Sequence, residues 1–393
     1  MKSSPRRLLT IGHSYIVPLN RRLANEMSRV AKADWDITIV APSTLKGDLR
    51  PLTLETDLHD RAGVKGVPVL FDRVPQLKLY RDRLREILQQ GWDLVHCWEE
   101  PYVLSGGQIA RQAPTKTPLV YFTAQNNSKR YPPPFNWIET QTMQRSSGWI
   151  APGQTVVAAL KHRQGYDRPM RIIPHGVDVE HFFPAPEMQQ SIRHRLEWDQ
   201  MNAPIVGFLG RFVPEKGLTM LMRVLDQVAQ PWRALFVGTG AMEAELRSWA
   251  ERYGDRVRIC TTVTHDQVPQ YLNAMDILCA PSQTTRKWRE QFGRMLIEAF
   301  ACGIPVIGSD SGEIPYVIEE AGVVIGEKDE KAWTQAISML IGDAALRTTL
   351  AQKGLDRAHS VYQWSVVARQ HLEFFDSILD KQYLQSSEEA QKC

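Results

Sequence analysis

The sequence lacks any apolar run long enough to cross a membrane. No stretch reaches the roughly 18 consecutive apolar residues that a spanning helix needs. Residues 8–11, behind a basic N-terminal segment, are also too few for the apolar core of a signal peptide, so we expect them to form a first buried strand. A cytoplasmic protein is therefore expected.

Cysteine is scarce, with five residues in a chain of 393, and none stands in a C-x-x-C pair. The odd number and the spacing argue against a disulfide framework. Three of the five lie in or beside strand-like apolar runs, which is typical of small core residues in a reducing compartment. The five are Cys97, Cys260, Cys279, Cys302 and Cys393.

The chain also lacks the strong positive charge of a nucleic-acid-binding protein. Its net charge is +3, its pI is about 8.5, and no basic helix of the groove-reading kind occurs. The charge is uneven, because residues 1–184 hold 25 Lys and Arg against 17 Asp and Glu, whereas the remainder holds 22 against 27. The basic first part indicates an anionic partner, such as a lipid surface or a charged acceptor, rather than nucleic acid.

Short strand-like runs alternate with longer amphipathic stretches along the chain, which predicts parallel sheets covered by helices on both faces. A chain of 393 residues exceeds what one core usually serves, so two such domains are expected. The predicted fold class is α/β, with two doubly wound Rossmann-like domains that face each other across a cleft. The expected strands are residues 8–12, 37–41, 67–71, 94–98, 119–123, 148–151 and 171–174, then 205–210, 234–238, 257–261, 277–280, 305–309 and 323–326. Helices are expected at residues 19–32, 79–89 and 364–379, and the series of strands breaks between residues 174 and 204.

Two glutamates, Glu290 and Glu298, bracket a segment that runs through a glycine into a helix and then an apolar strand. Eight helical residues span about 12 Å, so the two carboxylates would bind separate parts of one elongated ligand. If the helix begins at Gly293, backbone amides at its start would offer donors to an anion between them. This pattern fits a nucleotide-sugar. The alternative is a solvated helix with ordinary surface glutamates.

The run at residues 290–317, EQFGRMLIEAFACGIPVIGSDSGEIPYV, resembles the signature region of retaining family 4 glycosyltransferases, which have the two-domain GT-B fold. Residues 173–178 (IPHGVD), 210–217 (GRFVPEKG) and 276–282 (DILCAPS) resemble further landmarks of that family in the expected order. The resemblance covers most of the chain. It implies an acceptor-side domain at residues 1–184, with a last helix at 364–393 packing back on it, and a nucleotide-sugar-binding domain at residues 185–363.

By this resemblance Arg211, Lys216 and Glu290 form the catalytic set. Arg211 and Lys216 follow a strand directly, where two cations suit a diphosphate leaving group whose charge develops in the transition state. Glu290 would hold a hydroxyl of the donor sugar and Glu298 the ribose hydroxyls. Two exposed loop cations are the alternative for the arginine and the lysine. The expected donor-binding residues are Gly12, His13, Gly238, Val263, Phe292, Gly293, Arg294 and Glu298.

Four of these lie at or just after the ends of expected strands. Gly12, at the tip of the first strand, lets a phosphate approach the backbone, with His13 as a donor beside it, although a plain tight turn explains the same glycine. Gly238 begins a G-x-G that lacks the third glycine of a dinucleotide site, so NAD is not indicated. Backbone groups near Val263 would meet the base.

On the acceptor side the candidates are His96, Gln125 and Lys129. His96 ends a strand, where a buried, satisfied histidine is the commoner outcome. Many family members carry histidine where this chain has Gln125, which positions a hydroxyl but cannot act as a base. Lys129 opens a stiff basic segment, residues 129–134, that would line the acceptor entrance; a surface loop is the alternative.

No metal or other cofactor is implied. Asp34 and Asp36 match a D-x-D metal pattern of another glycosyltransferase fold, but they lie at the amino end of a strand, which predicts a solvated turn. The expected activity is metal-independent transfer, with retention, of a hexose from a nucleoside diphosphate sugar to a hydroxyl acceptor (glycan, lipid or small molecule). A GT-B epimerase or phosphorylase, or a non-catalytic nucleotide-sugar-binding protein, is the alternative.

Residues 73–85 carry five cations interleaved with leucines and a tyrosine. A basic amphipathic helix there would lie on an anionic membrane surface. The alternative is a helix that packs Leu84, Ile87 and Leu88 on a sheet and turns its basic face to water. At most a salt-sensitive peripheral membrane contact is expected.

Overall fold

The computed structural model describes residues 4–46, 51–198 and 203–391, with side chains to residue 381. Contacts divide the chain into unit 1, residues 1–174 with 364–393, and unit 2, residues 175–363. The expected boundary after residue 184 lies further along the chain than this division, because Val177 pairs with Gln363 and Phe182 is buried in the core of unit 2. Cys393 and residues 199–202 lie outside the described residues.

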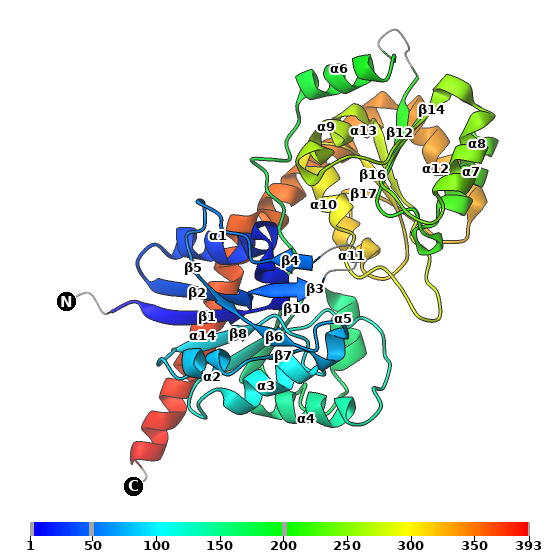
Figure 1. Cartoon of the computed structure of the whole chain (residues 1–393). Coiled ribbons are helices and arrows are strands. Elements are labelled where there is room, and N and C mark those ends of the chain that lie inside the picture. The colour runs from blue at the N-terminus through cyan, green and yellow to red at the C-terminus, as the bar shows by residue number, and fades with distance from the viewer. Residues whose placement is uncertain (1–3, 47–50, 199–202, 392–393) are drawn as a thin grey trace. The chain divides into compact units, whose positions relative to one another are not determined.

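Unit 1 is built on a parallel seven-stranded sheet with the order β11-β10-β9-β8-β1-β2-β5 (Figure 1). Both faces of this sheet are covered, so neighbouring residues such as Leu8 and Leu9 enter different cores. The strands are β1 (Arg6–Ile11), β2 (Trp35–Pro42), β5 (Gly63–Val67), β8 (Leu94–Cys97), β9 (Leu119–Phe122), β10 (Gly148–Ala151) and β11 (Met170–Ile172). Two small antiparallel pairs lie outside it, β3 (Thr44–Lys46) with β4 (Pro51–Thr53) and β6 (Val69–Leu70) with β7 (Leu79–Tyr80).

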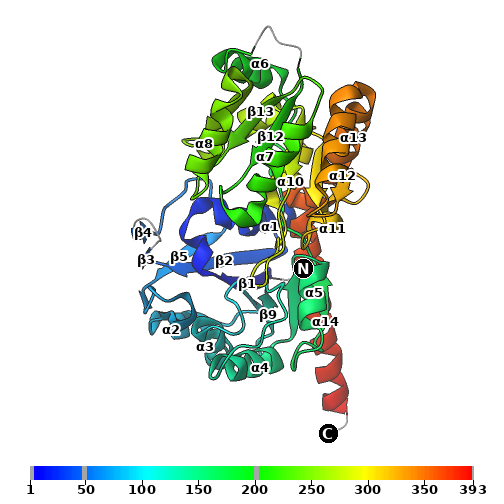
Figure 2. The same cartoon turned by 90° about the vertical axis from the view of Figure 1, so that its right-hand side faces the viewer.

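The helices of unit 1 divide between the two faces of the sheet. One core includes side chains from α2 (Arg83–Leu88), α3 (Leu104–Gln112), α4 (Phe135–Arg145) and α5 (Gln154–Leu160). The other includes α1 (Arg22–Ala31) and the last helix, α14 (Trp364–Gln391). There the Phe375 ring packs edge-on against Trp35, with centroids 6.3 Å apart. Figure 2 shows α14 continuing past the sheet to the C-terminal end of the chain.

The segment before α2 differs from the predicted strand at 67–71 and helix at 79–89. Leu79 and Tyr80 form the short strand β7, and the helix begins only at Arg83. Gln108 explains the extended backbone, because its side-chain amide accepts from the Tyr80 N–H at 2.9 Å and donates to the Tyr80 carbonyl at 2.6 Å. A contact across 28 residues therefore outweighs the local helical pattern.

Unit 2 contains a parallel six-stranded sheet with the order β14-β13-β12-β15-β16-β17. This order places the first strand, β12, in the interior of the parallel sheet. The next strands along the chain, β13 and β14, lie on one side of β12 and the later strands lie on the other. Ligands of such sheets bind at this switch point, at the carboxyl ends of the strands. The strands are β12 (Ile205–Leu209), β13 (Arg233–Val237), β14 (Val257–Cys260), β15 (Ile277–Ala280), β16 (Val306–Ser309) and β17 (Gly322–Ile325). The helices are α6 (Pro186–Arg195), α7 (Leu218–Gln227), α8 (Glu243–Glu251), α9 (Val268–Ala274), α10 (Arg294–Ala301), α11 (Ile314–Ile318), α12 (Glu330–Gly342) and α13 (Ala344–Arg357).

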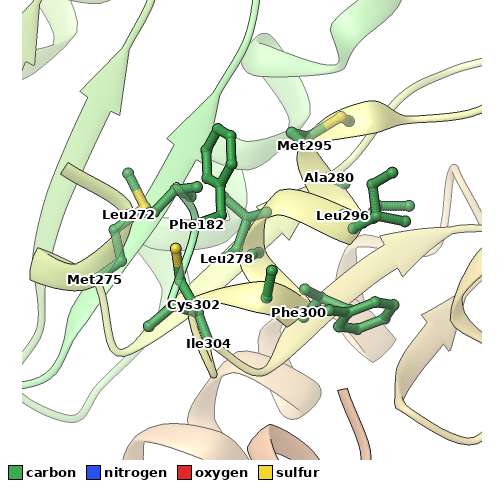
Figure 3. Packing of buried hydrophobic residues seen from close by; sticks show 14 of the residues in the cluster. Phe182, Leu272, Met275, Leu278, Ala280, Met295, Leu296, Phe300, Cys302 and Ile304 are labelled. Carbon is green, nitrogen blue, oxygen red and sulfur yellow. The ribbon is translucent and has the colours of Figure 1, made fainter. Parts of the chain in front are cut away.

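The core beneath α10 positions the residues that matter for function. Figure 3 shows Leu296 and Phe300 of α10 packed with Leu278 of β15 and Leu272 of α9. All four side chains are fully buried. Removing one such side chain typically costs about 2–5 kcal/mol, so the axis of α10 is fixed by packing rather than by its own hydrogen bonds.

A glycine at the start of α7 meets the backbone of another loop. Gly217 has φ +72°, and a Cβ there would lie 1.9 Å from the Pro281 carbonyl oxygen. We expect Gly217→Ala to lower the free energy of unfolding by more than the about 1–3 kcal/mol of backbone strain, because the clash adds to it. Gly342→Ala is the matched control, since a Cβ there meets nothing within 4 Å. Urea unfolding of both variants measures the difference, and equal stabilities would contradict the prediction.

Candidate functional site

A cavity of about 390 Å³ opens in unit 2 where β12 ends and α10 begins. Seven of the residues predicted from the sequence line it. They are Arg211, Lys216, Glu290, Phe292, Gly293, Arg294 and Glu298. Leu209, Val268 and Met295 add an apolar part, and His175 completes one side. Parallel strands and a helix start therefore gather cations, carboxylates and apolar surface from segments up to 123 positions apart into one cavity.

The helix start is shaped by Gly293, which caps α10 with φ +82° and ψ +59°. This left-handed conformation favours glycine and turns the chain sharply into the helix. The first turn of a helix leaves backbone N–H groups without intrahelical partners, and the helix dipole makes that end favourable for an anion. Phe292 is buried beside it, with its ring centroid 5.0 Å from His175. The predicted helix start is the one the structure has.

Lys216 and Glu290 form one ion pair. The Lys216 Nζ lies 2.5 Å from Glu290 Oε2, and Ser282 Oγ donates to the same oxygen at 2.8 Å. Both side chains are mostly buried. Trp288 covers the ammonium, with its ring centroid 5.4 Å from Nζ. The family resemblance assigned these two residues separate roles. Ser282 stood only as the last residue of the landmark at 276–282, without a role of its own.

Arg211 is the contrasting cation. It follows Gly210 at the end of β12 and its side chain is exposed. Within the part of the chain that the structure describes, no hydrogen bond or ion pair engages its guanidinium. A planar fork of donors without a protein partner, on the wall of a cavity, is suited to bidentate contact with phosphate oxygens.

Glu298 lies on α10, more than one helical turn after the N-cap residue Gly293. Burial raises the pKa of Glu298 to about 7, and the nearby Arg294 guanidinium opposes this shift. The carboxyl is therefore divided between its neutral and ionised forms near neutrality. A group in this state responds strongly to any ligand that prefers one form.

Gly238 and Val263 are not among the residues that line the cavity. Gly238, with φ +148°, lets its loop approach the Gly210 carbonyl, where a Cβ would lie 1.8 Å from the oxygen. Val263 follows β14 and packs partly buried against the core. The Gly238 backbone thus supports the loop that carries Arg211.

In unit 1, Gly12 and His13 follow β1. A Cβ on Gly12 would lie 2.8 Å from the Trp98 Cβ, so the glycine permits close approach of β1 to β8 rather than a left-handed turn. The His13 amide donates to Glu99 Oε1 at 2.8 Å, and its Nδ1 lies 3.2 Å from Oε2. Glu99 is fully buried, and nothing in the sequence singled it out beyond its place after a strand.

The acceptor-side candidates occupy different environments. His96 is fully buried against Trp98, His371 and Phe375, with Nδ1 3.3 Å from Thr10 Oγ1. It is buried, as in the alternative interpretation, but not fully satisfied, because its Nε2 has no hydrogen-bond partner among the described residues.

Gln125 is buried in a hydrogen-bonded cluster, where its amide donates to Glu100 at 3.2 Å and to Glu139 at 3.3 Å. Burial raises the pKa of Glu100, against the hydrogen bonds that it accepts. Lys129 is exposed, with Nζ 5.6 Å from the Tyr131 ring centroid. Arg163, which pairs with Glu139 at 2.8 Å, also holds the Lys129 carbonyl at 2.6 Å, so this loop is tied to the cluster.

Asp34 lies in the bend before β2, and Asp36 is exposed at the amino end of that strand, as in the expected solvated turn. Among the residues with described side chains, no three His, Cys, Asp or Glu residues form a group that could hold a metal ion.

Comparison with protein families gives two matches that together extend over both units. The model described as Glycosyltransferase Family 4 matches residues 19–181, and the one described as Glycosyl transferases group 1 matches residues 203–343. A GDP-mannose-dependent monoacylated alpha-(1-6)-phosphatidylinositol monomannoside mannosyltransferase of Corynebacterium glutamicum is 32% identical over 49% of this chain, and the match spans 52% of that relative's length. A D-inositol 3-phosphate glycosyltransferase of Corynebacterium jeikeium is 26% identical over 71% of this chain and 67% of its own.

Two solved structures are similar along nearly the whole chain. Sucrose-phosphate synthase from Thermosynechococcus elongatus has a TM-score of 0.72 at 22% identity, covering 96% of this chain and 100% of its own. The Anabaena protein HepE, solved in complex with UDP, has a TM-score of 0.72 at 19% identity, covering 95% and 100%. These likenesses confirm the predicted fold class of two parallel-sheet Rossmann-like domains.

Proposed function

The chain belongs to glycosyltransferase family 4 and has the GT-B fold, and we propose that it transfers a hexose from a nucleoside diphosphate sugar to a hydroxyl of an acceptor. The observation that carries this proposal is the cavity of unit 2, where the unpaired Arg211 guanidinium stands with the start of α10 and the carboxyl of Glu298. The cations and the amides at the helix start suit the diphosphate, and the carboxyl of Glu298 suits the ribose.

Each residue then has a role in transfer. Arg211 and Lys216 stabilise the charge that grows on the leaving diphosphate, which lowers the barrier more than it strengthens ground-state binding. Glu298 accepts hydrogen bonds from the ribose hydroxyls. Glu290 holds a hydroxyl of the donor sugar and keeps Lys216 in place. We propose a metal-independent reaction with retention, in which a donor phosphate oxygen takes the proton of the attacking hydroxyl.

The donor is the first property to test. One relative is named as GDP-mannose-dependent and another as a D-inositol 3-phosphate glycosyltransferase. One similar structure was solved in complex with UDP. GDP and UDP compounds are therefore the probes. Thermal unfolding with GDP, UDP, GDP-mannose and UDP-glucose tests the proposal. A ligand at 100 times its Kd adds about 2.7 kcal/mol of stability. Stabilisation by none of these four compounds would count against a nucleotide-sugar site.

Two other functions are distinguished by simple assays. An epimerase would change the sugar of a nucleotide-sugar supplied without any acceptor. A non-catalytic binding protein would be stabilised by the nucleotide-sugar but would transfer sugar to no acceptor.

We expect nucleotide binding to depend on Glu298 through pH. The free carboxyl has a pKa of about 7, and accepting two ribose hydroxyl bonds favours its ionised form. Affinity for GDP or UDP should therefore rise as pH increases, by up to about tenfold per unit below the pKa of the free carboxyl, and level off above it. Calorimetric titration between about pH 6 and pH 8 measures this dependence.

Glu298→Gln provides the control for that titration. The variant should retain only the pH dependence that arises from the ligand phosphate, because its amide does not titrate in this range. If wild type and Glu298→Gln have the same slope, Glu298 is not the linked group.

We also propose a weak peripheral contact with anionic membranes, made by other residues than the basic helix expected from the sequence. Leu84, Ile87 and Leu88 are buried, and Lys78 pairs with Glu99 inside unit 1, so α2 itself does not offer an apolar face to lipid. The nearby exposed apolar side chains are Leu70, Phe71, Val74 and Leu77, with Arg73 exposed among them. No described helix is both long enough and apolar enough to span a bilayer.

Co-sedimentation with anionic vesicles measures this contact. Binding should occur at low salt and disappear at about 1 M salt, where the Debye length is about 3 Å. Arg73→Glu should weaken the low-salt binding, and neutral vesicles are the control. Pelleting that persists at high salt would refute a mainly electrostatic attachment.

A further inference from the structure

A carboxylate is buried at the carboxyl end of β8, within unit 1, and five contacts from donors converge on it. Glu99 is 1% exposed. Its Oε1 accepts from the Tyr80 hydroxyl and from the His13 amide, both at 2.8 Å. Its Oε2 lies 2.9 Å from Ser105 Oγ, 3.1 Å from Lys78 Nζ and 3.2 Å from His13 Nδ1. A carboxylate has about four lone-pair sites, so its capacity is filled.

The charge of Glu99 fixes the hydrogen on His13. Burial raises the pKa of Glu99, but the Lys78 charge and the donors of His13 and Tyr80 outweigh it and hold the pKa below its ordinary value. An ionised carboxylate only accepts hydrogen bonds, so Nδ1 of His13 must carry the hydrogen that points at Oε2. In the neutral imidazole, Nε2 then has a free lone pair and is an acceptor.

His13 is the exposed end of this otherwise buried network. Its side chain is 49% exposed, whereas Lys78, Tyr80, Glu99 and Ser105 are all below 5%. The ring therefore reaches solvent at the carboxyl edge of the sheet while its orientation is set from inside the fold. An exposed acceptor fixed by buried partners has the form of a preorganised ligand contact.

Stability alone is a poor explanation of the network. Removing an ammonium and a carboxylate from water costs several kcal/mol per ion, and well-packed apolar residues often replace a buried ion pair without loss. Lys78 and Glu99 nevertheless lie together at 4% and 1% exposure. What apolar side chains could not supply is a charged oxygen that orients His13.

The arrangement also bears on the diphosphate contact expected of His13 from the sequence. The amide that would have met a phosphate already donates to Glu99. The remaining nitrogen, Nε2, is an acceptor in the neutral ring. A phosphate oxygen is also an acceptor, so the two cannot form a hydrogen bond. A neutral hydroxyl, which can donate to Nε2, is the better partner.

We propose that His13 accepts a hydrogen bond from a hydroxyl of the acceptor substrate, with Glu99 as the positioning residue that holds the ring in its Nδ1–H form. This inference rests on the proposed transferase function, since it assigns the acceptor side of that reaction. The ligand class is a neutral polyhydroxyl compound, such as a sugar or a cyclitol.

Nitrogen-15 NMR of the histidine rings tests the orientation directly, at a pH where the rings are neutral. His13 should show the Nδ1–H form, and Glu99→Gln should shift it toward the mixed pattern of His162, an exposed histidine of the same unit. D-mannose, D-glucose and myo-inositol are then added in turn. At least one should move the His13 Nε2 resonance in the wild type, with weaker apparent affinity in Glu99→Gln and no change at His162.

Several outcomes overturn the proposal. An Nε2–H form of His13 in the wild type contradicts the orientation. A His13 resonance that moves with GDP or UDP, or with none of the three polyols, contradicts the assigned ligand. Because Glu99→Gln could unfold unit 1, Tyr80→Phe is a second variant: it removes one bond to Oε1 and should leave the His13 form unchanged. Failure of every nucleotide to stabilise the protein would instead refute the transferase function, and the ring measurement would still stand by itself.

Discussion

Arg211→Ala is expected to remove about 2–4 kcal/mol of transition-state stabilisation and to lower kcat accordingly, while leaving thermal stability close to that of the wild type. The activity loss follows from removing a preorganised donor fork at the site of charge development. The stability should hold because Arg211 is exposed and, among the described residues, no partner is left unsatisfied when it is removed. Steady-state kinetics and thermal unfolding of the same preparation measure both quantities.

Two further variants give this prediction its controls. Arg211→Lys keeps a charge but loses the planar fork, so its kcat should lie between those of wild type and Arg211→Ala. Arg252→Ala removes an exposed arginine of the same unit that pairs with Asp226, away from the cavity, and should leave kcat unchanged. Near-normal turnover by Arg211→Ala would remove Arg211 from the proposed mechanism.

Lys216→Met should be more damaging, because it affects folding as well as catalysis. The substitution leaves Glu290 buried without its ammonium, and breaking a buried pair from one side typically costs about 3–5 kcal/mol of stability. It also removes a cation from the diphosphate site. We expect a lowered unfolding midpoint together with severely reduced turnover, measured by urea unfolding and by transfer or donor hydrolysis.

A double-mutant cycle separates the two effects. Adding Glu290→Gln to Lys216→Met removes the stranded charge, so the double variant should regain most of the lost stability but none of the lost activity. If the two single losses simply add in the double variant, the ion pair does not account for the destabilisation.

The sequence was sufficient for the fold class and for seven residues that line the cavity of unit 2, whereas Gly238 and Val263, predicted at other strand ends of this unit, do not line it. Alternating buried strands and helices are local patterns, and the glycine that begins α10 is visible in the sequence because few other residues adopt its backbone conformation. The resemblance to family 4 placed Arg211, Lys216 and Glu298 on one ligand, and the structure brings them to one cavity.

What the sequence missed depends on contacts between distant segments. Lys216 and Glu290 are 74 positions apart, and no local pattern shows that they share one hydrogen bond. Lys78 belongs to a basic stretch by composition but is buried beside Glu99, so its charge does not reach the surface. Periodicity indicates which face of an element is buried, but it does not identify the partner on the other side.

The chain path sets the order in which the two units can be completed during synthesis. Unit 2 is one continuous segment, residues 175–363, so every residue of its core leaves the ribosome before α14 does. Unit 1 is interrupted, and its second core needs Val367, Phe375 and Ile378 from that last helix. A nascent chain should therefore present a finished unit 2 beside an unfinished unit 1 with an open apolar face on its sheet. That interval, rather than the finished protein, is when chaperone binding and aggregation of this chain are expected to be greatest.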